Sequence, residues 1–153
     1  MAAVIKIGGH PPTRADFHRA IAERSDRWYS ACLKITRNPD LAADAVQDAL
    51  LNAWREREQF ANSSRLDTWI HRIAINAALN LLRKSRPGVF EALEADIEDQ
   101  SDHPDQVLQD HELENRLAAA LGRLSEVERV CFVLKHLEQW RVREIAEEIG
   151  TNE

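Results

Sequence analysis

The strongest constraint on the fold is the pattern of residues 40–80, where two segments with the apolar period of an α-helix flank a short polar loop. Residues 40–56 read DLAADAVQDALLNAWRE and residues 65–84 read RLDTWIHRIAINAALNLLRK. In both, apolar residues recur at steps of three and four, which places them on one face of a helix. The intervening QFANSS lacks this period. The pattern therefore predicts two helices joined by a loop.

A further helix is predicted before this pair. Thr13 and Asp16 have the spacing of a capping box, and the apolar repeat that follows continues to about residue 36. Asn38 and Pro39 then interrupt it, because proline does not continue a helix. The preceding residues contain Gly-Gly and Pro-Pro pairs, so we expect residues 1–12 to form a tail.

Helices return toward the end of the chain. One is expected from about Pro104, with a leucine repeat, and Ser125 with Glu128 forms a second capping box. The helix that this box opens should bury Val127, Val130, Cys131, Leu134 and Leu137. A short third helix should end at Gly150, and a helix followed by a glycine turn is typical of the start of a helix-turn-helix. We therefore predict an all-α chain of two small helical domains. Its parts are a tail at 1–12, one domain at 13–86, a linker at 87–106 and a second domain at 107–153.

The net charge of -6 hides a strong segregation of charge. Residues 1–86 hold 14 Lys and Arg against 9 Asp and Glu, whereas residues 87–115 hold 10 acidic residues and no Lys or Arg. The mildly basic first domain is compatible with nucleic acid, although the average charge argues against it. The acidic segment with its Pro-Gly and His-Pro breaks predicts a flexible linker.

Cys32 and Cys131 both lie inside helical apolar repeats, so we expect reduced core residues of a cytoplasmic protein. The first residues resemble no signal peptide, and no apolar run approaches the roughly 20 residues of a membrane-spanning helix. No nucleophile–base pair, phosphate-binding loop or metal-ligand spacing appears. The expectation is a protein that is not an enzyme and needs no cofactor or metal. The histidines and acids near residues 103–112 do not share a helical face, which argues against a metal site there.

The helix at 40–56 has an unusual outer face. Alanines dominate the inner stripe, which favours close contact with another helix. This inner stripe consists of Ala42, Ala45, Val46, Ala49, Leu50, Ala53 and Trp54. The opposite stripe combines an exposed leucine with acids and an amide, a combination that either is an ordinary solvated face or binds another protein. This outer stripe consists of Asp44, Gln47, Asp48, Leu51 and Arg55.

The loop and the next helix carry a second candidate site. Phe60 can stack on an unpaired base, or it can fill the core at a helix end, which is the commoner role. Ser63 or Ser64 can cap the next helix. That helix should bury Leu66, Trp69, Ile70, Ile73, Ala77 and Leu81, with Leu79 on the outer side. Arg72 and Asn76, one turn apart, can supply a phosphate and a base-edge contact.

Three segments together resemble the extracytoplasmic-function sigma factors of bacterial RNA polymerase. They are DLAADAVQDALLNAW, then F-x4-RLDTWIHRIAINAALNLLRK, then LSEVERVCFVLKHLEQWRVREIAEEIG. Their order is that of sigma region 2, an acidic linker and part of region 4. The resemblance implies RNA polymerase core and promoter DNA as partners, an anti-sigma factor as a further partner, and no membrane insertion.

The resemblance also implies roles for individual residues. The outer stripe matches the helix that docks on the coiled coil of the polymerase's largest subunit. The loop matches the one that captures a flipped base of the -10 element, and Asn76 matches a polar residue beneath it. The acidic linker matches the segment that threads the RNA exit path. The residues implied at the -10 element are Phe60, Asn62, Ser63, Ser64, Arg65, Arg72, Asn76, Arg83 and Lys84.

The residues present stop at Glu153, before the helix that should follow the turn. Without it we expect no reading of a -35 element, and a loosely ordered second domain unless a partner covers its apolar surface. An alternative function stays open: a sigma-like decoy that binds an anti-sigma regulator without initiating transcription.

Overall fold

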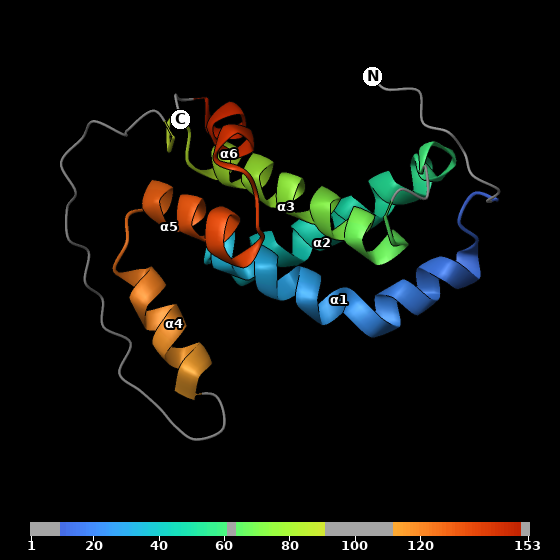
Figure 1. The fold of residues 1–153 in the computed structure, drawn as a ribbon, viewed down its shortest axis with the longest axis horizontal. Helices are drawn as coiled ribbons and strands as arrows, with labels where there is room; N and C mark the ends of the chain where they lie inside the picture. The colour runs from blue at the N-terminus through green and yellow to red at the C-terminus, as the bar shows by residue number, and fades with distance from the viewer. Residues whose placement is uncertain (1–9, 61–63, 91–111, 151–153) are drawn as a thin grey trace. The chain divides into compact units, whose positions relative to one another are not determined.

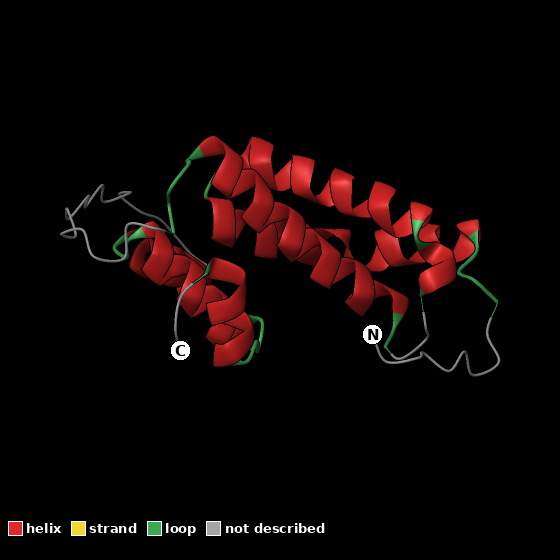
Figure 2. Ribbon diagram, turned by 90° about the horizontal axis from the view of Figure 1, so that it is seen from above, coloured by secondary structure: helices red, strands yellow, loops and turns green. Residues whose placement is uncertain are grey.

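A computed structural model describes residues 10–60, 64–90 and 112–150. The described residues form helices and turns without a strand, which confirms the all-α prediction (Figure 2). The chain divides into two units, Met1–Lys84 and Ser85–Glu153. No helix in the described ranges is both long and apolar enough to cross a membrane. The predicted linker falls almost entirely outside the described residues.

The first unit begins with α1, Arg14–Thr36, which starts at the predicted capping box. The Thr13 hydroxyl accepts a hydrogen bond from the backbone N–H of Asp16, and the Asp16 carboxylate accepts one from the N–H of Thr13. These bonds satisfy N–H groups that a helix start leaves without partners. They also lower the pKa of the Asp16 carboxyl below its ordinary value of 3.8.

A tight turn reverses the chain between α1 and α2, Pro39–Arg55. Arg37 adopts a left-handed conformation with φ 51° and donates its backbone N–H to the Leu33 carbonyl at 2.7 Å. Asn38 caps α2 through its side-chain oxygen, which accepts from the N–H of Asp40 and of Leu41. The short connection makes α1 and α2 antiparallel neighbours (Figure 1).

Alanine makes the contact between these two helices close. The inner stripe of α2 places Ala42, Ala45, Ala49 and Ala53 in the core, each with no exposed surface. Helix α1 packs closely along α2 and itself buries Trp28, Cys32 and Ile35. A side chain of one methyl group lets the two backbones approach, so a larger residue at these positions has no space to occupy.

Helix α3, Leu66–Ser85, packs along α1 in the same direction (Figure 1). Two hydrogen bonds fix its register. The Trp28 indole donates to the Asp67 carbonyl at 3.2 Å, and the Cys32 thiol donates to the Ala74 carbonyl at 3.4 Å. Between α2 and α3 lies the short 3-10 helix η1, Arg57–Gln59.

The second unit contains α4, Glu112–Gly122, then α5, Glu126–Phe132, the π-helical turn η3, Val133–Leu137, and α6, Val142–Ile149. Ser125 and Glu128 form the predicted capping box. Helix α6 ends at Gly150, whose φ of 75° lies in the left-handed region that glycine adopts without strain. The predicted starting point of α4, near Pro104, lies outside the described residues. The loose order expected of this unit in the isolated chain stays a prediction, which hydrogen exchange would test.

Ala45→Leu should lower the free energy of unfolding by about 1–3 kcal/mol, because the added carbons have no space between α1 and α2. Ala43→Leu is the matched control, since Ala43 lies on the exposed side of the same helix; its effect should stay within about 0.5 kcal/mol. Urea unfolding followed by circular dichroism measures both. Equal effects at the two positions would contradict the close alanine contact.

Asp16→Asn should reduce the free energy of unfolding by about 0.3–1 kcal/mol at neutral pH, because asparagine keeps an acceptor but lacks the charge at the helix start. The pKa of Asp16 is lowered in the folded chain. Its contribution is therefore present above the ordinary value and is lost as the pH falls through the lowered one. Unfolding curves of both proteins should converge once the pH lies below the lowered pKa of Asp16; a difference that persists there would exclude a charge effect.

Candidate functional site

The predicted outer stripe is on the surface of α2. Asp44, Gln47, Asp48, Leu51 and Arg55 are all exposed, and half of the Leu51 surface is accessible. The stripe lies opposite the alanine face that contacts α1. An exposed leucine between carboxylates and an amide has the anatomy of a small protein-binding surface, with an apolar centre and a polar rim.

Trp54 corrects one prediction for this helix. The repeat assigns it to the buried stripe, but 38% of its surface is exposed. Its ring meets the edge of Phe17 at 5.2 Å between centroids, and the Arg57 guanidinium lies 4.0 Å above it. The indole is thus too large to enter the narrow alanine contact. It lies at the helix end instead, where it covers Phe17 and extends the apolar surface beside Leu51.

Helix α3 buries a different arc from the predicted one. Ile70 is buried as expected, but Ala74, Ile75, Ala78, Leu79 and Leu82 are buried too. Leu66, Trp69, Ile73, Ala77 and Leu81, which we predicted inside, are only half-buried. Leu79, predicted on the outer side, has no exposed surface. Apolar residues cover most of the circumference of α3, so periodicity alone does not select the part that meets the core.

The polar side chains of α3 are interspersed with apolar residues on its outer side. Arg72 and Lys84 are exposed, while Asn76 and Arg83 are half-buried. Arg83 donates to the side-chain oxygen of Asn80 at 2.9 Å. Arg72, Asn76 and Arg83 lie within one arc of the helix, and they offer cationic and amide groups suited to phosphates and base edges.

Phe60 occupies the alternative role given by the sequence. Only 6% of its surface is exposed, and its ring lies 5.1 Å from that of Trp69. The ring therefore joins the loop to α3 and is not presented for base stacking in this structure. Ser64 and Arg65 are exposed, and the Ser64 hydroxyl donates to the Arg65 carbonyl. Asn62 and Ser63 lie outside the described residues.

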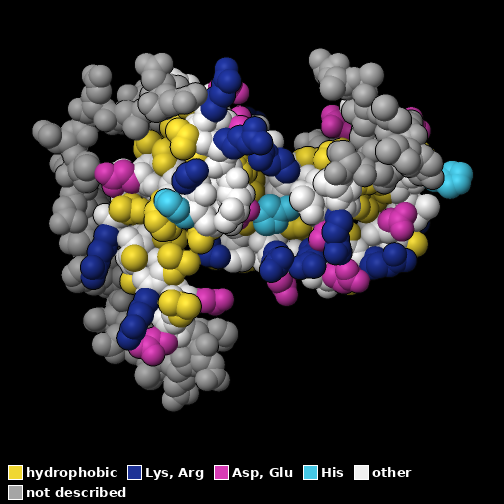
Figure 3. Space-filling model, viewed as in Figure 1, with side chains coloured by type: hydrophobic (Ala, Val, Ile, Leu, Met, Phe, Trp, Pro, Cys, Tyr) yellow, Lys and Arg dark blue, Asp and Glu magenta, His cyan; other side chains and the backbone are white. Residues whose placement is uncertain are grey.

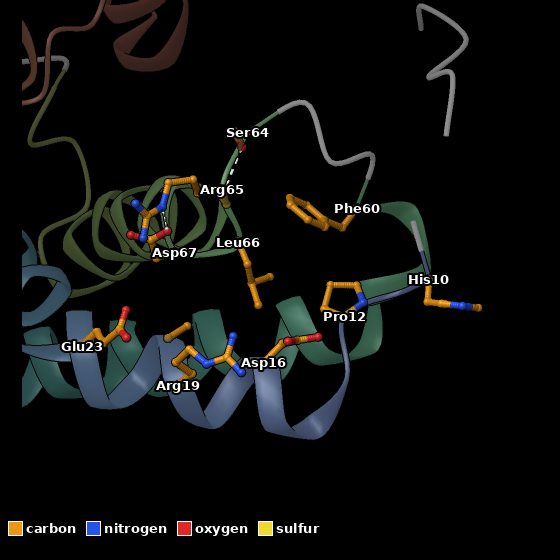
Figure 4. A pocket seen from close by; sticks show the side chains of 11 residues that line it. His10, Pro12, Asp16, Arg19, Glu23, Phe60, Ser64, Arg65, Leu66 and Asp67 are labelled. Carbon is orange, nitrogen blue, oxygen red and sulfur yellow. Dashed lines mark hydrogen bonds and ion pairs between the residues drawn. The ribbon is translucent and has the colours of Figure 1, made fainter. Parts of the chain in front are cut away.

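A hollow beside the loop is lined by residues of α1 and of the start of α3 (Figure 4). Its lining combines carboxylates, guanidinium groups and the edge of the loop. Asp67 lies there in ion-pair contact with two arginines, an arrangement that the sequence interpretation missed. The signal available was an acid two residues after Arg65, at the first turn of a helix otherwise lined with cations. The residues lining the hollow include Asp16, Arg19, Glu23, Phe60, Ser64, Arg65 and Asp67.

The surface charge of α1 is mixed. Figure 3 shows Lys and Arg side chains interspersed with Asp and Glu along this helix, without one large patch of a single sign on the face drawn. Mixed charge gives little attraction for duplex DNA by itself. A DNA contact through α3 would therefore depend on other interactions that bring the two together.

The second unit leaves apolar residues on its surface. Phe132 is 37% exposed, Leu137 38% and Val142 46%. The Phe132 ring lies 4.8 Å from His136. Leu137, predicted inside the apolar stripe of its helix, is therefore partly outside, since the π-helical turn at Val133–Leu137 changes the period. Cys131 is half-buried, and this burial raises the pKa of its thiol.

Comparison with known families matches both units. Sigma-70 region 2 matches residues 21–87, and Sigma-70, region 4 matches residues 114–153. The helical first unit, with its outer stripe and its polar α3 face, thus belongs to a sigma-70-type transcription protein.

Curated relatives narrow the class. An ECF RNA polymerase sigma factor SigG from Mycobacterium tuberculosis is 32% identical over 91% of this chain and 44% of its own length. SigW from Bacillus subtilis is 26% identical over 80% of this chain and 71% of its length. The sigma-E factor of Haemophilus influenzae is 31% identical over 68% of this chain and 60% of its length. The chain belongs to the ECF sigma factors. It spans less than half the length of the Mycobacterium relative.

Proposed function

We propose that this protein is a promoter-specificity subunit that docks on RNA polymerase core and recognises and opens the -10 element. The observation that carries the proposal is the exposed leucine of the outer stripe, held on a helix whose opposite face is fixed in the core by alanines. Family membership supports the same activity, since its relatives are RNA polymerase sigma factors by name.

Docking would use the outer stripe as a compact patch. Leu51 is the exposed apolar centre, and Asp44 and Asp48 provide charge on the same face. Polymerase core offers a coiled coil on its largest subunit as the partner that the family resemblance implies. A buried leucine contributes affinity on binding, and the surrounding acids add specificity through charge complementarity. Gln47 and Arg55 lie on the rim of this patch.

DNA recognition would use the stripe of α3 after docking. Arg72, Arg83 and Lys84 provide contacts to phosphates, and Asn76 can read a base edge. Ser64 and Arg65, at the end of the loop, would contact the unpaired DNA strand. Asn62 and Ser63, the preceding residues in the sequence, are proposed for the same contact. Extruding a base costs a few kcal/mol, and capture of that base offsets part of the cost. Phe60 supports the loop from below by packing on Trp69.

The acidic linker would occupy a basic channel of the polymerase, where its carboxylates take the place of the phosphates of a nucleic acid. Such work takes place in the cytoplasm, which we propose as the location. An anti-sigma factor is proposed as a further partner that competes for the outer stripe.

Asp48→Arg should weaken binding to RNA polymerase core by roughly tenfold or more, because it reverses a charge at the centre of the docking patch. Asp26→Arg is the matched control. It makes the same reversal on the exposed side of α1, outside the proposed patch, and should leave the affinity unchanged. Fluorescence titration of core with labelled protein measures both.

If the folded wild type fails to bind core, the initiation role is wrong and the decoy function would lead. If both reversals weaken binding equally, the effect is one of net charge and the outer stripe is not the docking surface.

Asn76→Ala should reduce the retention of a -10 fork-junction DNA by the polymerase complex about 5- to 150-fold, the range expected for one base contact. The loss should be smaller for DNA with an altered -10 sequence, because the variant lacks a contact that reads sequence. Arg72→Ala should instead weaken all sequences alike and reduce the salt slope by about one. Asn52→Ala, an exposed asparagine on α2, is the control. Equal losses on both DNAs for Asn76→Ala would exclude a base contact.

A further inference from the structure

One carboxylate, that of Asp67, is shared by two arginines from different parts of the first unit. Its Oδ2 lies 3.2 Å from Arg24 Nε on α1, and its Oδ1 lies 3.0 Å from Arg65 Nε at the end of the loop. Figure 4 shows the Arg65 side chain turned toward Asp67. The Arg65 contact is a hydrogen bond, whereas Arg24 Nε is buried without hydrogen-bond geometry to any partner in the described residues. The Arg24 contact is therefore purely electrostatic.

Asp67 and Arg65 differ in their exposure to solvent. The Asp67 side chain is 14% exposed, and its backbone carbonyl is held by the buried Trp28 indole. Arg65 is 69% exposed and belongs to the segment just before α3. The carboxylate is therefore mostly enclosed and is also paired with Arg24, while the guanidinium of Arg65 can leave it at little cost, since exposed ion pairs stabilise a fold weakly.

The position of Arg65 makes this pair relevant to DNA. Arg65 adjoins the loop proposed to meet the promoter strand, and arginine binds a phosphate with two parallel hydrogen bonds. A phosphate would have to replace Asp67 as its partner. A nearby fixed carboxylate also repels the phosphate, which lowers the attraction of this site for any DNA backbone.

We infer that Asp67 is a positioning residue that holds Arg65 and offsets part of its charge, so that DNA gains the Arg65 contact only by displacing Asp67. The inference rests on the proposed function of the loop and α3 in DNA binding. Asp67 then acts as an electrostatic brake on binding that is independent of sequence. Asp67 opposes binding least when a correctly docked -10 strand makes other contacts, because these contacts keep a phosphate beside Arg65.

Asp67→Asn tests the inference in the full chain bound to polymerase core. Binding of a fork-junction DNA should tighten about two- to fivefold at low salt, the equivalent of one released surface ion pair. The slope of log K against log salt should become steeper by up to about one. Both changes should vanish in an Arg65→Gln background, because Arg65 is the group through which Asp67 acts. Asp67→Ser repeats the measurement with a smaller side chain if thermal melting shows that the asparagine variant is unstable.

Glu23→Gln is the matched control, since Glu23 lines the same hollow from α1. It should change neither affinity nor slope by comparison with Asp67→Asn. Unchanged or weaker binding by Asp67→Asn, an equal gain with Glu23→Gln, or a gain that persists in the Arg65→Gln background would each overturn the inference. A wild-type complex that binds core but retains no DNA would instead refute the proposed DNA-binding function itself.

Discussion

The close contact between α1 and α2 is the interaction on which the first unit depends. Four alanines of α2 are fully buried, and α1 is the helix that packs closely along α2. The fully buried residues of α2 have methyl side chains only, so this helix contributes little apolar volume to the core. Its stability therefore depends on close packing against α1. Its outer face is then free to carry Leu51 and the acids at defined positions. A helix held firmly by its buried face presents its outer side chains at defined positions, as a protein-binding surface requires.

Helix α3 is positioned in another way. Side chains of α1 donate hydrogen bonds to two of its backbone carbonyls, from the Trp28 indole and from the Cys32 thiol. The two carbonyls are seven residues apart and lie on one face of α3, so these bonds set both its position along the axis and the face that it turns to α1. The packing of Phe60 on Trp69 then fixes where the loop leaves the core. The end of the loop and the ion pair thus lie at the start of α3, whereas the polar side chains of this helix extend from Arg72 to its last turn at Lys84.

The sequence predicted those parts of the fold that depend on local chemistry. The capping boxes at Thr13 and Ser125 and the helix end at Gly150 each follow from residues within one turn of each other. The alanine stripe of α2 was also predictable, since polar residues surround it. The buried arc of α3 was not, because apolar residues around most of this helix leave the choice to tertiary packing.

The candidate site shows the same division. The outer stripe of α2 could be identified because an exposed leucine among acids conflicts with a simple solvated face. The burial of Phe60 and the partial exposure of Trp54 depend on neighbours distant in sequence, such as Trp69 and Phe17. The shared carboxylate of Asp67 likewise needs Arg24, which is 43 residues away in the chain.

The two thiols of this chain are chemically unequal. Cys32 is fully buried and donates to a backbone carbonyl, whereas Cys131 is half-buried in the other unit. A thiol reagent therefore reaches Cys131 in the folded chain, slowly at neutral pH because the raised pKa leaves little thiolate. It reaches Cys32 only when the first unit opens. The native sequence thus carries an attachment point for a label in one unit and a built-in indicator of unfolding in the other.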